Sequence, residues 1–295
     1  GGNGVDLADY SSSSVGVNLT LAEAGLEATA TIGSEQDKVK DIENISGSSA
    51  NDVLGGNSSS NVLTGNEGND TFLASDGLDT FVGGTGVDTI DYSSRNSGIE
   101  ITLNGSNQSI LKESGANKDT VSEVENVIGS QGNDTINGDD SSNIIKGEAG
   151  NDTISGGKGN DVLEGGSGID TVDFTFIDND QFSNKGINAD LSANQVVDLN
   201  QNDVDSVSGF ENVNGTKYSD TIKGDSQNNT LYGNAGDDSL SGGAGDDYLV
   251  GGSGNDTLKG GAGNDQFVGG ADLDTVDYSD STDAVTVDLK ATTPQ

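Results

Sequence analysis

The sequence contains no cysteine, histidine, methionine or tryptophan, and it has a single proline among its 295 residues. Without cysteine there is no disulfide framework, and without thiol or imidazole ligands the usual zinc, copper and iron sites are excluded. No apolar run approaches the length of a membrane-spanning helix. Basic residues are scarce as well, with 12 lysines and arginines against 50 aspartates and glutamates.

The excess of acidic residues gives the chain a formal net charge of -38 at pH 7. Such a chain repels nucleic acid and anionic membranes, so we expect neither nucleic-acid binding nor membrane insertion. Its carboxylates instead attract hard cations such as Ca²⁺ or Mg²⁺. Only 30% of the residues are apolar and 46 are glycine, a composition that is also typical of disordered chains. Composition alone therefore leaves two alternatives open, an acidic disordered tract and a folded metal-binding protein.

A repeat of nine residues decides between these alternatives. In three blocks, residues 47–91, 129–173 and 215–277, the eighth residue of every nine is aliphatic or Phe and the sixth is Asp or Asn. The eighth residues are Leu54, Leu63, Phe72, Phe81, Ile90, Ile136, Ile145, Ile154, Leu163, Val172, Ile222, Leu231, Leu240, Leu249, Leu258, Phe267 and Val276. A disordered linker has no reason to keep an apolar residue in register. We therefore expect an ordered core in the metal-bound state and disorder only without metal.

The individual repeats carry a family resemblance. The segments "GGKGNDVLE" from Gly156 and "GGSGNDTLK" from Gly251 match the pattern G-G-x-G-x-D-x-U-x, where U is a large apolar residue. The chain thus resembles the RTX, or hemolysin-type, calcium-binding repeat proteins. The resemblance implies an all-β parallel β-roll or β-helix solenoid, here three tandem rolls joined by β-rich spacers. In each repeat the first six residues form a turn and the last three a short strand, and two repeats complete one coil.

The resemblance also implies Ca²⁺ between two loops that stack on the same edge, loop i and loop i+2. Each loop then supplies its Asp carboxylate and backbone carbonyls. Asp70 and Asp88 share one edge in this arrangement, whereas Asn61 and Asp79 share the other. Ca²⁺ fits better than Mg²⁺, because it accepts six to eight oxygen ligands in flexible geometry. Pairing the loops in this way predicts about 11 or more ions.

The predicted ligands fall into groups according to their position in the repeat. The sixth-position carboxylates are Asp52, Asp70, Asp79, Asp88, Asp134, Asp152, Asp161, Asp170, Asp220, Asp238, Asp247, Asp256, Asp265 and Asp274. Weaker candidates are Asp6, Asn61, Asn143, Asn229, Glu43, Glu125 and Glu211. First-position glycines whose carbonyls face the ion are Gly65, Gly83, Gly147, Gly156, Gly165, Gly233, Gly242, Gly251, Gly260 and Gly269. The Asn residues occupy the second loop of each block, where we predict a weak or empty site.

The segments between the blocks resemble one another. Each begins with an aromatic residue and continues with an alternating strand, such as Ile99, Ile101 and Leu103. Each ends on an E-N dipeptide, and counting back nine residues from the first core position puts its Glu at a sixth position. We infer one extra rung there, whose Glu is either a further ligand or a surface residue over a hydrophobic cap. The resulting segments are the end of a preceding roll (1–9), spacers (10–46, 92–128, 174–214), rolls (47–91, 129–173, 215–277) and a truncated spacer (278–295). We expect the chain to be a piece of a longer protein.

The sequence shows no catalytic constellation, so we expect no enzymatic activity. The main hypothesis is a calcium-folded structural segment, as in RTX adhesins, surface-layer or filament proteins. The alternative is a noncatalytic module of a secreted enzyme, such as a serralysin-type protease, a lipase or an alginate epimerase. The resemblance implies a bacterial, secreted, extracellular or cell-surface protein that leaves the cell by type I secretion and folds on meeting Ca²⁺. Calcium ions are the expected partners, with self-association or surface attachment left open.

Overall fold

The computed structural model describes residues 1–175, 185–200, 202–281, 284 and 286. Part of the third spacer and most of the truncated spacer lie outside these residues. The chain divides into two compact units, Gly1–Asp152 and Thr153–Gln295. Within the described residues the regular structure is β-strand apart from one short 3-10 helix, η1 (Leu191–Ala193). The predicted all-β class is confirmed.

The strands are short, and most follow one loop of the repeat. In the first unit they are β1 Leu7–Asp9, β2 Val17–Thr20, β3 Glu27–Ile32, β4 Glu35–Lys40, β5 Asn44–Ser46, β6 Val53–Gly55, β7 Val62–Glu67, β8 Thr71–Leu73, β9 Thr80–Thr85, β10 Thr89–Asp91, β11 Ile99–Thr102, β12 Ser109–Glu113, β13 Ala116–Ser122, β14 Asn126–Ile128, β15 Thr135–Asn137 and β16 Ile144–Lys146. In the second unit they are β17 Thr153–Ser155, β18 Val162–Glu164, β19 Thr171–Asp173, β20 Ile187–Asp190, β21 Gln195–Asp198, β22 Val204–Ser208, β23 Asn212–Asn214, β24 Thr221–Lys223, β25 Thr230–Ala235, β26 Ser239–Ala244, β27 Tyr248–Ser253, β28 Thr257–Ala262, β29 Gln266–Ala271 and β30 Thr275–Val276.

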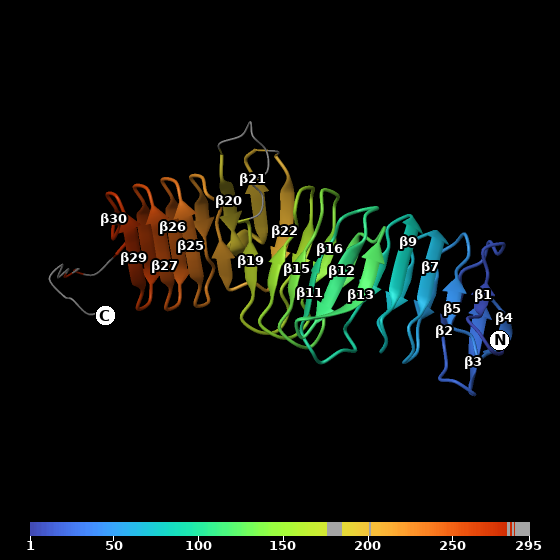
Figure 1. The fold of residues 1–295 in the computed structure, drawn as a ribbon. Coiled ribbons are helices and arrows are strands. Elements are labelled where there is room, and N and C mark those ends of the chain that lie inside the picture. Colours follow the sequence, from blue (N-terminus) through green and yellow to red (C-terminus); the bar gives the residue numbers. More distant parts are fainter. Residues whose placement is uncertain (176–184, 201, 282–283, 285, 287–295) are drawn as a thin grey trace. The chain divides into compact units, whose positions relative to one another are not determined.

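Alternate repeats stack in parallel register. Leu54 of β6 lies beside Phe72 of β8, and Phe72 lies beside Ile90 of β10. The intervening repeats form the facing sheet, in which Leu63 of β7 lies beside Phe81 of β9. Two nonapeptides therefore complete one coil, as the resemblance implied. Figure 1 shows the same stacking of β25, β27 and β29 in the second unit.

The core is a double row of eighth-position side chains between the two sheets. Phe72 and Phe81 come from opposite sheets, and their ring centroids are 5.7 Å apart in an edge-to-face arrangement. These side chains are buried from Leu54 through Leu258. Phe267 is half-buried and Val276 is 41% exposed. The core prediction thus fails only at these last two positions, since no further described coil covers them.

Each spacer adds an antiparallel meander to one sheet while the other sheet continues directly. In the first unit the second spacer forms β11, β12 and β13, which fill the gap between β9 and β15. On the other sheet β10 pairs with β14, and β14 with β16, without interruption. In the second unit β20, β21 and β22 form the corresponding meander between β24 and β18. The sequence pattern predicted one strand at the start of each spacer but not the meander.

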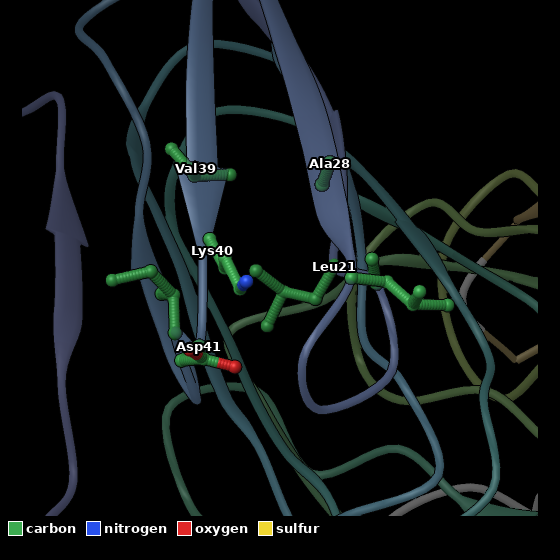
Figure 2. A pocket seen from close by; sticks show the side chains of 8 residues that line it. Leu21, Ala28, Val39, Lys40 and Asp41 are labelled. Carbon is green, nitrogen blue, oxygen red and sulfur yellow. The ribbon is translucent and has the colours of Figure 1, made fainter. Parts of the chain in front are cut away.

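The first spacer forms a meander of β2, β3 and β4 next to β6. Figure 2 shows the small hollow at its end, which Leu21, Ala28 and Val39 line, and Asp41 follows β4. Asp41 has a left-handed backbone with φ 50°, and its carboxylate accepts a 2.7 Å hydrogen bond from the Gly25 amide. This hydrogen bond ties the turn after β4 to the turn before β3, and the chain then returns to the roll at β5.

Candidate metal sites

The first-position glycines bring oxygen atoms together in the loops. A Cβ added to Gly65 would lie less than 3.0 Å from both Oδ2 of Asp70 and the carbonyl oxygen of Gly83. The carbonyls of Gly83, Gly147, Gly233, Gly242, Gly251 and Gly269 take this place opposite the glycines two repeats earlier. Only glycine fits here, because any side chain would collide with the converging oxygens.

The sixth-position residues form rows along each edge of the rolls. The backbone amide of Asp52 donates to Oδ1 of Asp70 at 2.8 Å, and the amide of Asp70 donates to Oδ1 of Asp88 at 2.8 Å. The same bond joins Asn61 to Asp79 at 2.9 Å on the other edge. Further links join Asp134 to Asp152, Asp220 to Asp238, Asn229 to Asp247, Asp238 to Asp256, Asp247 to Asp265 and Asp256 to Asp274. The stacking of loop i on loop i+2 is thus seen in hydrogen bonds from backbone amides to side-chain oxygens, while the Ca²⁺ ions shared by such loops stay a prediction.

Some of these aspartates accept a hydrogen bond from a hydroxyl of their own loop, and we call their loops closed. Asp52 accepts from the amide of Ser48 at 2.6 Å, from its hydroxyl at 2.8 Å and from the amide of Val17 at 2.7 Å. Closed loops share Ser or Thr at the second position, where the hydroxyl reaches the sixth-position carboxylate. The closed-loop aspartates are Asp52, Asp79, Asp134 and Asp220.

Other loops, which we call open, leave a carboxylate oxygen for a cation. Among the described residues, buried Oδ2 atoms with no hydrogen-bond partner belong to Asp70, Asp88, Asp238, Asp247 and Asp256. Open loops share a second-position residue with a left-handed backbone: Asn66 (φ 82°), Gly84 (φ 111°), Asn234 (φ 74°), Gly243 (φ 110°) and Gly252 (φ 119°). The loops of Asp152, Asp161, Asp170, Asp265 and Asp274 have the same left-handed residue at Glu148, Gly157, Gly166, Gly261 and Gly270. The metal-ligand role of all the sixth-position residues stays a prediction, and the open loops are the ones whose surroundings favour it.

The second loop of each block substitutes an amide for the carboxylate. The Asn61 side-chain amide donates to the carbonyl of Glu43 at 2.6 Å, and its Oδ1 accepts from the amide of Asn57 at 2.8 Å. Asn143 and Asn229 repeat the donation to the carbonyls of Glu125 and Glu211. These Asn side chains are thus hydrogen-bonded to the neighbouring rung, and the weak or empty calcium sites at their loops stay a prediction.

The E-N dipeptide forms the extra rung that the sequence predicted. The Asp88 amide donates to Oε2 of Glu125 at 2.7 Å, and Asp6 and Asp170 make the same bond to Glu43 and Glu211. A Cβ on the first-position glycine of each last loop would collide with a carbonyl that the sequence reading missed. These carbonyls belong to Asp41, Glu123 and Gly209, each two residues before the Glu and each with positive φ. Each junction thus offers a further group of convergent oxygens.

Two carboxylates in the spacers were also missed. Asp119 in β13 accepts from the amide of Asp79 at 2.8 Å, and Asp205 in β22 accepts from the amide of Asp161 at 3.0 Å. Both occupy the place of a sixth-position Asp. The signal was present in the sequence, because "DTV" at 119–121 and "DSV" at 205–207 keep the spacing between the sixth and eighth positions.

Burial raises the pKa of the open-loop carboxylates. Desolvation, followed by the charges of neighbouring aspartates, raises the pKa of Asp238 to about 8 and that of Asp70 to about 7. The same causes raise the pKa of Asp205 to about 7, with Asp161, Asp203 and Asp198 as the neighbouring charges. A bound cation would lower these pKa values, since its positive charge favours the ionised carboxylates and offsets their mutual repulsion.

The donor set fits Ca²⁺. Carboxylate and carbonyl oxygens are its preferred ligands, and the sequence offers no thiol or imidazole. Within the part of the chain that the structure describes, no three acidic side chains converge on one point. Backbone carbonyls must therefore complete each site, as the glycine geometry allows.

A comparison with protein-family models finds the RTX calcium-binding nonapeptide repeat. It matches residues 41–71, 55–90, 122–145, 137–172, 207–240, 214–249 and 241–276, which together cover more than half of the chain. The chain belongs to the RTX calcium-binding repeat family. No curated protein is found to match this RTX chain. Among its described residues, no helix is long and apolar enough to cross a membrane.

Proposed function

We propose that this RTX chain is a calcium-folded, extracellular structural segment of the stalk, adhesin, surface-layer or filament type. The observation that carries the proposal is the set of buried Oδ2 atoms without hydrogen-bond partners at Asp70, Asp88, Asp238, Asp247 and Asp256. A buried carboxylate without a partner strongly destabilises a fold. A folded roll therefore needs a cation at these loops or protons on the carboxylates.

Bound Ca²⁺ supplies the positive charge that these loops lack. The chain's own residues do the positioning, since each Oδ1 is held by an amide of the preceding coil while Oδ2 faces the loop interior. Because the unfolded chain does not hold these oxygens together, the free energy of binding becomes free energy of folding. Low intracellular Ca²⁺ keeps the chain unfolded for export, and extracellular Ca²⁺ folds it.

The structural role, as opposed to a module of a secreted enzyme, is supported by the repetition of roll and spacer. Three rolls follow one another, and a meander fills one sheet at each spacer, so that β-stacking continues through the spacer. In such a chain each coil is stabilised by the coils stacked directly on it, as in other solenoids. Stacking that continues past a spacer within a unit favours a structural segment.

Far-UV circular dichroism of the 295-residue chain tests the calcium switch. We expect coil in chelator, β-structure in millimolar Ca²⁺, and little change with the same concentration of Mg²⁺. Limited proteolysis should give protection under the Ca²⁺ condition alone. Identical spectra in chelator and in Ca²⁺ would refute the proposal.

A further inference from the structure

One loop of the first roll, residues 74–79, departs from the glycine pattern of the other loops. The first position of every other nonapeptide in the three blocks is glycine, whereas here it is Ala74. A Cβ on Gly65 or Gly83 would lie less than 3.0 Å from Oδ2 of the aspartate in the same loop, a contact that real side chains do not tolerate. Ala74 carries such a Cβ, so the oxygens of its loop do not converge as those of the open loops do. The loop does not fit Ca²⁺ in that way.

The carbonyl oxygens of this loop contact the Lys118 ammonium instead. Lys118 belongs to β13, which stacks on β9 in the same sheet. Its Nζ donates to the carbonyl of Ser75 at 3.0 Å and to the carbonyl of Gly77 at 2.5 Å. It also lies 3.7 Å from Oδ1 of Asp119, which accepts from the amide of Asp79. The ammonium thus lies between the carbonyls of one loop and the carboxylate of the rung stacked on it, where the family resemblance implies Ca²⁺.

The buried Asp119 carboxylate has partners for both of its oxygens. Oδ1 accepts from the Asp79 amide and faces the ammonium, and Oδ2 accepts from the hydroxyl of Tyr92. In open loops, by contrast, Oδ2 has no hydrogen-bond partner, as at Asp70 and Asp88. A buried carboxylate needs a positive partner or hydrogen-bond donors, and here the chain supplies both.

A second basic side chain is bound to the same loop. Arg95, the single arginine of the chain, lies 2.7 Å from Oδ1 of Asp76 through Nη1 and 3.1 Å from Oε2 of Glu113 through Nη2. Glu113 ends β12, the strand next to β13. Asp76 is largely exposed, so this ion pair adds little stability by itself. It does attach the loop to the spacer, and it brings a further positive charge to an acidic edge.

We propose that the Lys118 ammonium takes the place of a Ca²⁺ ion between loop 74–79 and β13, so that this edge binds no metal. The inference rests on the proposed calcium-dependent function, because it names one edge of the first unit that is exempt from it. The lysine is covalently part of the chain, so its charge is present at every Ca²⁺ concentration. The contact between β9 and β13 therefore depends on the chain's own charge and not on the metal.

Native mass spectrometry of the full 295-residue chain in Ca²⁺ tests the proposal by counting ions. Asp119→Asn should bind as many ions as the unsubstituted chain, because no ion uses that carboxylate. The double variant Ala74→Gly/Lys118→Gln restores the glycine and removes the ammonium, so it should bind one ion more. The matched control is Ala74→Gly alone, which keeps the ammonium and should leave the count unchanged.

The outcomes separate this inference from the proposed function. One ion fewer in Asp119→Asn would overturn the inference and leave calcium-dependent folding intact. An unchanged count in the double variant would overturn it as well, since removal of the ammonium would then open no place for an ion. A chain that binds no Ca²⁺ at all would overturn the proposed function and this inference with it. Should Asp119→Asn fail to fold, the double variant decides, because it keeps that carboxylate.

Discussion

The backbone amide of Asp70 donates to Oδ1 of Asp88 at 2.8 Å, although the two residues are 18 apart in the sequence. The two oxygens of the Asp88 carboxylate therefore have different roles. Oδ1 fixes the side chain to the preceding coil, and the buried Oδ2 has no hydrogen-bond partner. The same division holds for Asp238 and Asp256. An amide at such a position would keep the structural bond and lose the anionic oxygen.

Open and closed loops should therefore respond differently to the same substitution. In Asp238→Asn the Asp220 amide keeps its acceptor, but the loop loses its charge. We expect Ca²⁺ affinity at this loop to fall at least about tenfold, or about 1.4 kcal/mol. Calorimetric titration would measure the change. Asp220→Asn is the matched control, because Oδ2 of Asp220 already accepts from the Thr216 amide at 2.6 Å. Equal losses in both variants would contradict the distinction.

The reverse substitution should create a site. The Asn229 side-chain amide donates to the carbonyl of Glu211 at 3.0 Å, so a carboxylate in its place would lack this bond. We expect Asn229→Asp to bind one additional Ca²⁺ ion and to be less stable than the unsubstituted chain in chelator, because it puts a carboxylate against that carbonyl. Ion counting by native mass spectrometry and chelator-dependent circular dichroism would show the two effects. An unchanged count with unchanged stability would mean that the amide does not replace an ion.

Much of this arrangement can be read from the sequence, because the repeat fixes which residues share an edge. The eighth-position rows and the pairing of Asp70 with Asp88 follow from a period of nine and two repeats per coil. The closed state of Asp52 is harder to predict, since it depends on the hydroxyl of Ser48 and on the amide of Val17 from a distant strand.

The spacers were the least predictable part, because their contacts depend on long-range pairing rather than on the period. The spacing of the residues does not predict the contact between Lys118 and the loop carbonyl of Ser75, which is 43 residues earlier in the chain. The D-x-U spacing of Asp119 and Asp205 is present in the sequence, but both residues lie outside the continuous runs of nonapeptides, so the period does not assign them to an edge. The nonapeptide period thus predicts the contacts within the rolls, whereas the contacts within the spacers depend on which distant strands pair.

The hydroxyl of Tyr92 should contribute to stability independently of calcium. It is the donor to the buried Oδ2 of Asp119, so Tyr92→Phe leaves that oxygen without a partner. We expect a loss of about 1–3 kcal/mol in the free energy of unfolding of the first unit. Urea denaturation in saturating Ca²⁺ would measure it. The control is Tyr232→Phe, whose ring packs edge-to-face with Tyr248 at 6.4 Å, and it should change stability by less than about 0.5 kcal/mol. Similar losses in the two variants would count against the assigned role of the hydroxyl.

Without calcium, acid should stabilise the rolls. Desolvation followed by neighbouring charge raises the pKa of Asp238 to about 8 and the pKa of Asp70 to about 7, against an ordinary value of 3.8. At pH values between 3.8 and these raised pKa values, the two carboxyls hold protons in the folded chain that they have released in the unfolded chain. Stability therefore increases as the pH falls from about 8 towards about 4, and it is lost as the pH rises through the raised pKa values.

Circular dichroism in chelator across this range would test the expectation, which is stronger β-structure at pH 5 than at pH 8. Asp238→Asn should flatten the upper part of the profile, because burial raises the pKa of this carboxyl to about 8. In saturating Ca²⁺ the trend should reverse, since protons then compete with the cation for the same oxygens. β-structure in chelator that strengthens with rising pH would show that the buried carboxylates are compensated by some group other than a proton or a metal ion.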